Sequence, residues 1–232
     1  MAKRCMLHPL TNELHGARRI ATVITMAHPD WNARYAEGDL PWDTGKPDEH
    51  LVKIVDGGAV KAGRTLEIGC GTGTNALWLA ARGFDVLAVD LAPLAIEKAR
   101  AKAAGARNCL FEVLDFLAGK PEGGPFDFVF DRGTFHVFDE ADVRARFAER
   151  VAGLLAPGGR WLSLIGSTEG GPRDTGPPRR TAREVLASIE PVLELVDLHA
   201  DYFETMIEGP AAMAWICVSR RRAVDAVPST RR

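Results

Sequence analysis

Four acidic side chains each stand at the end of a short apolar run: Glu67, Asp90, Asp115 and Asp131. Ligands of open α/β sheets bind beyond the carboxyl ends of parallel strands, so acids at strand ends gather at one edge. A carboxylate accepts hydrogen bonds and therefore suits hydroxyl and amino groups, such as those of a nucleoside. One such acid is common on any surface, but four at strand ends indicate a ligand site.

A glycine-rich turn follows the first of these runs. The sequence from 65 to 74 is TLEIGCGTGT, and its acid, Glu67, stands two residues before the first glycine. Glycine is needed where the backbone adopts positive φ or must approach a ligand closely. The dinucleotide fingerprint GxGxxG would place its third glycine at position 74, which is a threonine. The turn therefore departs from the dinucleotide fingerprint by one position.

The elements that position these residues alternate along the chain. We expect strands at 64–68, 85–90, 109–114, 126–131, 160–165, 192–198 and 211–218, and helices at 49–58, 75–81, 93–104, 140–155 and 181–189. Repeated strand-then-helix units predict a mostly parallel sheet with helices on both faces. The last two strands are joined only by residues 202–210, too short for a parallel crossover, so that pair should be antiparallel.

Composition limits the class of protein. The chain has 232 residues, 46% of them hydrophobic and 26% charged, with a formal net charge of −2. This balance predicts a soluble protein without nucleic-acid or membrane partners, because no basic face or long apolar run is present. The cysteines at 5, 70, 109 and 217 lack CxxC or zinc spacing. They predict reduced thiols in a cytoplasmic protein and no metal site.

The chain divides into an arm, one domain and a tail. Residues 1–29 are expected to be a disordered N-terminal arm or the product of an upstream start, since Met26 could begin the protein equally well. They carry no recognisable secretory signal. Residues 30–222 form the domain, and residues 223–232 form a basic tail that we expect to be disordered.

An aromatic segment opens the domain. Residues 30–51 hold Trp31, Tyr35 and Trp42, although aromatic residues make up only 7% of the chain. One interpretation is that these rings pack on the sheet edge. The other is a lid that closes over the ligand, which suits a cationic ligand because aromatic faces attract cations.

Several runs resemble one family. EIGCGTG resembles the first motif of class I S-adenosylmethionine-dependent methyltransferases. WNARYAEGDLPWDTGKP and FDFVFDRGTFHVF resemble the N-terminal signature and the fourth motif of their thiol, thiopurine and halide methyltransferase group, and AWICVSRRR resembles its last strand. The resemblance covers about residues 30–222. It implies a Rossmann-like α/β fold, with a seven-stranded, mostly parallel sheet, helices on both faces and an antiparallel terminal strand.

The resemblance also implies the residues that bind S-adenosylmethionine. Asp90 would accept hydrogen bonds from the ribose hydroxyls, and Asp115 would lie near the adenine amino group with Phe116 beside the ring. The small Cys70 would lie under the cofactor rather than act as a nucleophile. The full predicted set is Trp31, Tyr35, Trp42, Glu67, Gly69, Cys70, Gly71, Gly73, Asp90, Leu91, Asp115, Phe116 and Asp131.

Three residues near the end of the fourth strand are candidates for catalysis. Methyl transfer is an in-line displacement that depends mainly on alignment and exclusion of water. Asp131 would lie at the reacting edge. Arg132 would stabilise an anionic acceptor, unless it belongs to a structural ion pair. His136 would remove a proton near neutral pH, unless it is a core residue.

Other residues are weaker candidates. Tyr202 precedes the last strand, and Arg179 and Arg180 end a loop rich in glycine and proline. The arginines could attract an anionic substrate, although a solvated pair is the simpler interpretation.

The predicted function is methyl transfer from S-adenosylmethionine to a small-molecule nucleophile, with S-adenosylhomocysteine as product. We favour a thiol sulfur, because a thiol of pKa ~8.5 is partly ionised at neutral pH without a strong base. The alternatives are an oxygen, nitrogen, halide, selenium or tellurium acceptor, or a protein that binds the cofactor without turnover. The expected assembly is a monomer or weak homodimer.

Overall fold

The computed structural model describes residues 30–38, 40–172, 176–206 and 211–222. The predicted arm at 1–29 and tail at 223–232 lie outside the described residues. Within the described part, no helix is long and apolar enough to cross a membrane.

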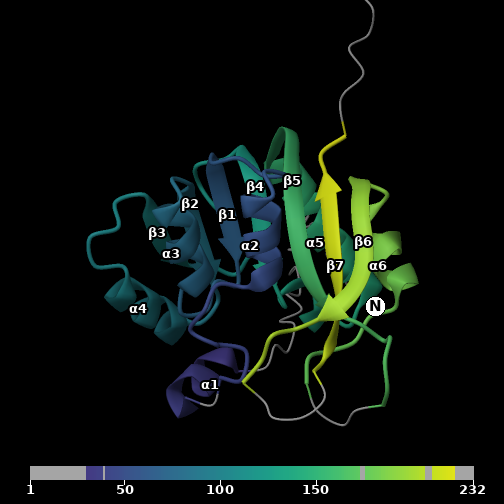
Figure 1. Ribbon diagram of the computed structural model, residues 1–232, viewed down its shortest axis with the longest axis horizontal. Coiled ribbons are helices and arrows are strands. Elements are labelled where there is room, and N and C mark those ends of the chain that lie inside the picture. Colours follow the sequence, from purple (N-terminus) through teal and green to yellow (C-terminus); the bar gives the residue numbers. More distant parts are fainter. Residues whose placement is uncertain (1–29, 39, 173–175, 207–210, 223–232) are drawn as a thin grey trace, which may run out of the picture.

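One seven-stranded sheet forms the centre of the fold (Figure 1). Its strands are β1 (Arg64–Ile68), β2 (Asp85–Asp90), β3 (Cys109–Val113), β4 (Phe126–Arg132), β5 (Leu155–Gly166), β6 (Glu194–Tyr202) and β7 (Met213–Arg220). The spatial order is β3-β2-β1-β4-β5-β7-β6. β7 lies between β5 and β6 and is antiparallel to both. The predicted mostly parallel sheet with an antiparallel terminal strand is confirmed.

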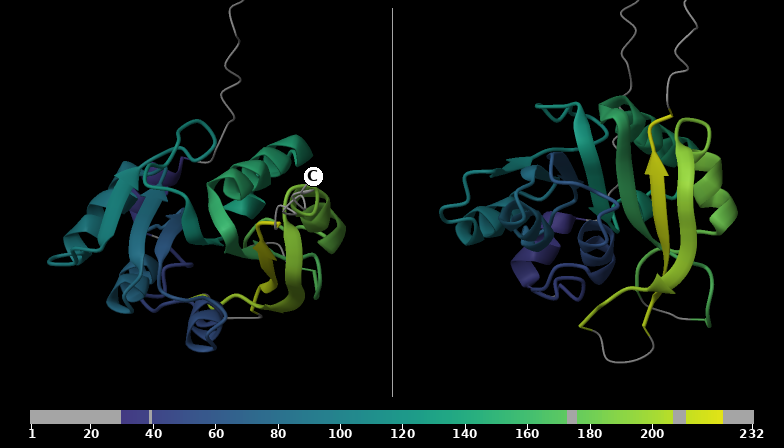
Figure 2. Two further views of the ribbon diagram at one scale, coloured as in Figure 1. Left: turned by 90° about the horizontal axis from the view of Figure 1, so that it is seen from above. Right: turned by 45° about the horizontal axis from the view of Figure 1, so that its top comes forward.

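Helices cover both faces of the sheet, as predicted (Figure 2). They are α1 (Trp31–Glu37), α2 (Glu49–Asp56), α3 (Thr74–Ala81), α4 (Pro93–Lys102), α5 (Ala141–Leu154) and α6 (Ala182–Ile189), with a short 3-10 helix η1 at Phe135–Val137. One hydrophobic core lies on the side of α2 and α3, and a second on the side of α5 and α6. The α5 spacing of Val143, Phe147 and Val151 places all three in the second core.

The register of β1 and β4 decides which side chains share a face. Ile68 of β1 pairs with Asp131 of β4, and Glu67 pairs with Phe130. Successive side chains of a strand point to opposite faces. Asp131 therefore lies on the α5 face with Ile68. Arg132 follows it and lies on the α3 face with Glu67.

Some boundaries differ from those expected. β5 starts at Leu155, before the Pro-Gly-Gly sequence, because Leu155 pairs with Phe126 and an irregularity follows in the ladder. β6 continues to Tyr202 rather than ending at 198. Most of its residues are half-buried or exposed, as suits an edge strand, so its end lacks a hydrophobic signal. The sequence did not predict α1, which starts after Asp30 caps the Ala33 amide at 3.0 Å.

Candidate functional site

The glycine turn connects β1 to α3 and needs its glycines for two reasons. Gly69, Gly71 and Gly73 have φ of +70°, +54° and +81°, values that favour glycine. A Cβ on Gly69 would collide with the hydroxyl of Thr134, and a Cβ on Gly71 would lie 2.9 Å from the Tyr35 hydroxyl. The turn is therefore enclosed by side chains from the segment that follows β4 and from the aromatic segment.

Asp90 ties the end of β2 to this turn. Its Oδ2 accepts a hydrogen bond from the Gly71 amide at 2.8 Å, and its Oδ1 accepts one from the Ala92 amide at 2.9 Å. Burial raises the pKa of the carboxyl above its ordinary value, although these amide bonds oppose the shift. A carboxylate has about four lone-pair positions, so Asp90 can still accept from ligand hydroxyls.

Glu67 is a buried acid with one unmatched oxygen. Its side chain is 2% exposed, and Oε1 accepts a hydrogen bond from Asn75 Nδ2 at 3.3 Å. Oε2 is buried and has no hydrogen-bond partner among the described residues. Burial raises the pKa of this carboxyl to about 8. A buried oxygen without a donor is costly, which marks this place for a cationic or hydrogen-bonding ligand.

The aromatic segment packs on the turn. Tyr35 is 5% exposed, and burial raises the pKa of its hydroxyl. Trp42 contacts the rings of Trp31 and Tyr35 edge to face, at centroid distances of 5.9 and 6.4 Å. Together with Leu40, these rings form a small cluster with the start of α4. The segment therefore lies against α4 and the glycine turn.

Two polar contacts hold this segment in place. Lys98 Nζ of α4 donates to the Tyr35 carbonyl at 2.6 Å. Thr72, inside the glycine turn, donates from its hydroxyl to Asp43 Oδ2 at 2.6 Å. The second contact joins the aromatic segment directly to the turn.

Arg132 is the centre of an ion pair rather than a free cation. Its Nε donates to Asp48 Oδ2 at 2.7 Å, and Nη1 donates to the Trp42 carbonyl at 3.2 Å. Nη2 donates to the Glu204 carbonyl. Of the two interpretations of Arg132 given above, this geometry agrees with the structural ion pair. An anionic acceptor would meet a guanidinium whose charge Asp48 already balances.

The structure places Asp131 near the end of β4 with its side chain directed into the core. The side chain is fully buried on the α5 face, where Oδ2 accepts from Trp161 Nε1 at 2.8 Å and Oδ1 accepts from the Phe135 amide at 3.0 Å. Burial raises the pKa of the carboxyl to about 6. The expected catalytic and cofactor-binding roles do not fit this position, because the register of β4 points Asp131 into the core.

His136 is held in one tautomer. Its Nδ1 accepts a hydrogen bond from the Gly166 amide at 2.7 Å, and an amide N–H can only donate. The neutral ring therefore carries its proton on Nε2, and its basic lone pair is already in use. Its side chain is 4% exposed, and the ring meets Phe203 edge to face at 6.0 Å. The expected role as a proton acceptor does not fit this arrangement.

Phe116 and Asp115 have local structural roles. Phe116 is 6% exposed and packs against Phe147 of α5 at a centroid distance of 4.7 Å, so its ring belongs to the core instead of lying beside an adenine. Asp115 Oδ1 accepts from the Leu117 amide at 2.9 Å and closes the turn after β3.

Leu91 and Cys70 flank the site in different ways. Leu91 follows Asp90 and is 39% exposed, so it is accessible to a ligand. Cys70 is buried in the glycine turn, and burial raises the pKa of its thiol well above the ordinary value. A neutral, buried thiol is a poor nucleophile, in agreement with a packing role.

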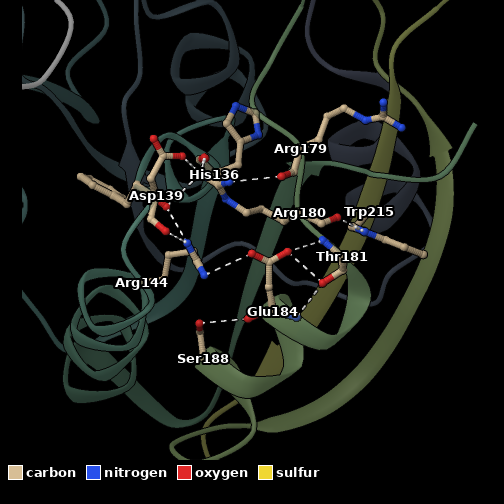
Figure 3. Close-up of polar contacts among 10 residues, drawn as sticks. His136, Asp139, Arg144, Arg179, Arg180, Thr181, Glu184, Ser188 and Trp215 are labelled. Atoms are coloured by element: carbon tan, nitrogen blue, oxygen red, sulfur yellow. Dashed lines mark hydrogen bonds and ion pairs between the residues drawn. The ribbon is translucent and has the colours of Figure 1, made fainter. Parts of the chain in front are cut away.

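Arg179 and Arg180 are not a solvated pair, and Figure 3 draws the contacts of Arg180. Arg180 is 7% exposed, and its Nη2 donates to Asp139 Oδ1 at 2.6 Å and to the His136 carbonyl at 2.8 Å. Arg179 donates to the carbonyls of Ser167, Thr168 and Glu169. Both side chains therefore hold the loop after β5 in place through hydrogen bonds within the protein.

Comparison of the sequence with known protein families identifies the family of this chain. Residues 26–204 match the family of thiopurine S-methyltransferases. The chain belongs to the thiopurine S-methyltransferase family. The predicted resemblance to class I S-adenosylmethionine-dependent methyltransferases of the thiol and thiopurine group is therefore confirmed, and the cofactor of this group is S-adenosylmethionine.

Two plant methyltransferases are similar in sequence to this thiopurine S-methyltransferase family member. A probable thiol methyltransferase 2 of Arabidopsis thaliana is 34% identical over 64% of the chain and 65% of the relative. Thiocyanate methyltransferase 1 of Brassica oleracea is 29% identical over 82% of the chain and 81% of the relative. The chain thus spans just under two thirds of the first of these relatives.

A solved structure supports the same fold. It is described as "Conversion of a Disulfide Bond into a Thioacetal Group during Echinomycin Biosynthesis". It superposes with a TM-score of 0.73 at 26% identity, and the match covers 84% of this chain and 92% of that one.

The described residues fit the cofactor of the family. Glu67 Oε2 is buried and has no hydrogen-bond donor among the described residues, so it can accept from an amino group. Asp90 keeps lone pairs for hydroxyl groups beside Gly71, where the backbone approaches closely. These are the parts of the predicted cofactor set that the structure brings together on one face of the sheet.

Sequence reasoning missed two residues that contact the candidate site. Asp48 lies at the start of α2, and Asn75 lies in the first turn of α3. Asp48 carried a signal, because an aspartate directly before a helix is a favoured N-cap. Asn75 carried no such signal beyond its place after the glycine turn. Only the fold brings Asp48 to Arg132 and Asn75 to Glu67.

Proposed function

We propose that this protein transfers the methyl group of S-adenosylmethionine to a small molecule and that the acceptor atom is a thiol sulfur. The observation that carries the proposal is the match of residues 26–204 to thiopurine S-methyltransferases. The similarity to a protein named as a probable thiol methyltransferase supports the sulfur acceptor. The product would be S-adenosylhomocysteine.

Within the described part of the chain, the predicted catalytic side chains favour an acceptor that ionises by itself. Asp131 is buried in the core, His136 uses its lone pair on the Gly166 amide, and Arg132 is paired with Asp48. A thiol of pKa ~8.5 is a few per cent thiolate at neutral pH. Alcohols and amines need a base, so a thiol suits this edge better.

The cofactor, when bound, would supply an electrophilic methyl group. We assign its amino group to Glu67, its hydroxyl groups to Asp90, and close backbone contact to Gly71. Tyr35 and Trp42 would cover it and exclude water, and their ring faces suit its positive charge. Three described cysteines are free thiols, which is in keeping with a reducing compartment such as the cytoplasm.

Release of S-adenosylhomocysteine tests this proposal. Purified protein is incubated with S-adenosylmethionine and a panel of simple thiols, sulfide, thiopurines, thiocyanate, alcohols and amines. We expect the neutral thiols and thiopurines to react fastest. Thiocyanate should react more slowly, because Asp48 balances the charge of Arg132. Turnover of only alcohols or amines would contradict the sulfur acceptor, and cofactor binding without any turnover would contradict the enzyme.

A further inference from the structure

Asn75 bridges the buried acid of the cofactor site to the start of α2. Its Oδ1 accepts from the Asp48 amide at 2.9 Å, and its Nδ2 donates to Glu67 Oε1 at 3.3 Å. A backbone N–H can only donate, so it fixes the oxygen of the Asn75 amide toward Asp48. The amino group must then face Glu67. The orientation of this side chain is therefore determined by its partners.

Asp48 extends the bridge to β4. It is 3% exposed, and its backbone amide is the group that Asn75 accepts from. Its Oδ1 caps α2 at the His50 amide at 2.9 Å, and its Oδ2 accepts from Arg132 Nε at 2.7 Å. Since each of these polar atoms of Asp48 has a partner, a shift of Asn75 would be transmitted to Arg132.

Arg132 holds together two segments that are distant in sequence. These are residues 40–43 and residues 203–206, and we call the two segments together the strap. Arg132 donates to the Trp42 carbonyl in the first and to the Glu204 carbonyl in the second, and its guanidinium lies 5.4 Å from the Phe203 ring centroid. The segments also bond directly, because the Met206 amide donates to the Pro41 carbonyl at 3.0 Å.

We propose that Asn75 and Asp48 are positioning residues that couple the cofactor site to the strap. An amino group bound at Glu67 favours the ionised carboxylate, whose hydrogen bond from Asn75 becomes charge-assisted and stronger. The bridge through Asp48 then fixes Arg132 and both strap segments. Occupation of the glycine turn thus stabilises the strap further, so the acceptor side is completed after the cofactor binds. The inference rests on the proposed function, because it assigns the cofactor to Glu67.

Hydrogen exchange measures this coupling without any acceptor. Exchange of peptides covering residues 40–48 and 202–206 is followed with and without saturating S-adenosylhomocysteine. In the wild type we expect the ligand to slow exchange in both peptides. In Asn75→Ala we expect binding to weaken while this added protection is lost at saturation. Equal protection in Asn75→Ala and the wild type would overturn the proposal.

Two further variants separate the coupling from general damage. Asn75→Asp keeps an acceptor for the Asp48 amide but places a second carboxylate beside Glu67, so it should weaken ligand binding about tenfold or more, by the loss of a hydrogen bond to a charged group and by repulsion. Unchanged affinity would count against the bridge. Asn108→Ala is the matched control, because Asn108 donates to the Ala80 and Phe84 carbonyls, away from the strap. It should leave the protection intact.

Steady-state kinetics adds a second readout. At saturating cofactor, Asn75→Ala should raise the KM of the acceptor about fivefold or more, the lower range of typical coupling, with a smaller change in kcat. An unchanged KM would overturn the coupling. If the wild type fails to bind S-adenosylhomocysteine, the proposed function itself fails, and a wild type that binds without strap protection refutes only this inference.

Discussion

The carboxylate of Asp48 and the guanidinium of Arg132 form an ion pair of 2.7 Å although 84 positions separate them in the sequence. The two side chains are 1% and 12% exposed. Such a pair is held largely out of water, so its loss leaves a buried charge rather than a hydrated one. Its geometry joins α2 to β4 at the carboxyl edge of the sheet.

Removal of one partner of this pair should destabilise the fold. We expect Asp48→Ala to lower the free energy of unfolding by about 3–5 kcal/mol, because Arg132 is then buried without its anion. Chemical denaturation measures the change. The control is Glu194→Gln, which breaks the exposed pair with Arg220 and should change the free energy of unfolding far less, because solvent screens that pair. Similar costs for the two variants would contradict the buried character of the first pair.

Asp90 should contribute directly to cofactor affinity. Replacement by alanine removes a charged acceptor, and we expect S-adenosylhomocysteine to bind about 1–3 kcal/mol more weakly in calorimetry. Asp85→Ala at the exposed start of the same strand is the control and should bind as the wild type does. Wild-type affinity in Asp90→Ala would remove Asp90 from the site.

Glu67 should make the stability of the free protein depend on pH. Its pKa in the folded protein is about 8, above the ordinary 4.5, so the folded protein holds the proton more tightly than the unfolded chain. This contribution is complete below pH about 4.5 and is lost as pH rises through about 8. Glu67→Gln lacks it. We therefore expect the thermal unfolding temperature of the wild type to fall relative to that of Glu67→Gln between pH 5 and 8.5. If the unfolding temperatures of the two proteins depend on pH in the same way, the assignment is refuted.

His136 should prove dispensable as a base. Glutamine can offer an oxygen to the Gly166 amide, so His136→Gln should keep the loop in place. We expect its kcat to remain within about tenfold of the wild type, less than the usual 10²–10⁴ contribution of a general base. The pH profile of kcat/KM is the decisive measurement. Loss of an acidic limb in His136→Gln, with the fold intact, would restore the proton-acceptor role.

The sequence predicted the sheet and the glycine turn well because both have local signals. Apolar runs, the glycine spacing and the acid before it are contained within a few residues each. The burial of Asp131 and Phe116 was not predicted, because a position at a strand end does not say which face the side chain takes. The register of Ile68 with Asp131 settles that, and a count along β4 separates Asp131 from Arg132.

The contacts of Arg132 and His136 could not be inferred in the same way. Each depends on a backbone atom from another part of the chain, at Glu204 and Gly166. Backbone atoms are the same in every residue and leave no trace in the sequence. The fold alone brings them into place, and this is why the catalytic set was harder to predict than the glycine turn.

The order of strands has a consequence for how such a protein could diversify. Glu67, Asp90 and the glycine turn come from one continuous stretch that includes β1 and β2, whereas the strap comes from the segment before α2 and the connection between β6 and β7. If the proposed role of the strap holds, mutations in it would alter the acceptor side without any change in the sequence from β1 to β2. Likeness between relatives is therefore a better guide to the shared methyl donor than to what each of them methylates.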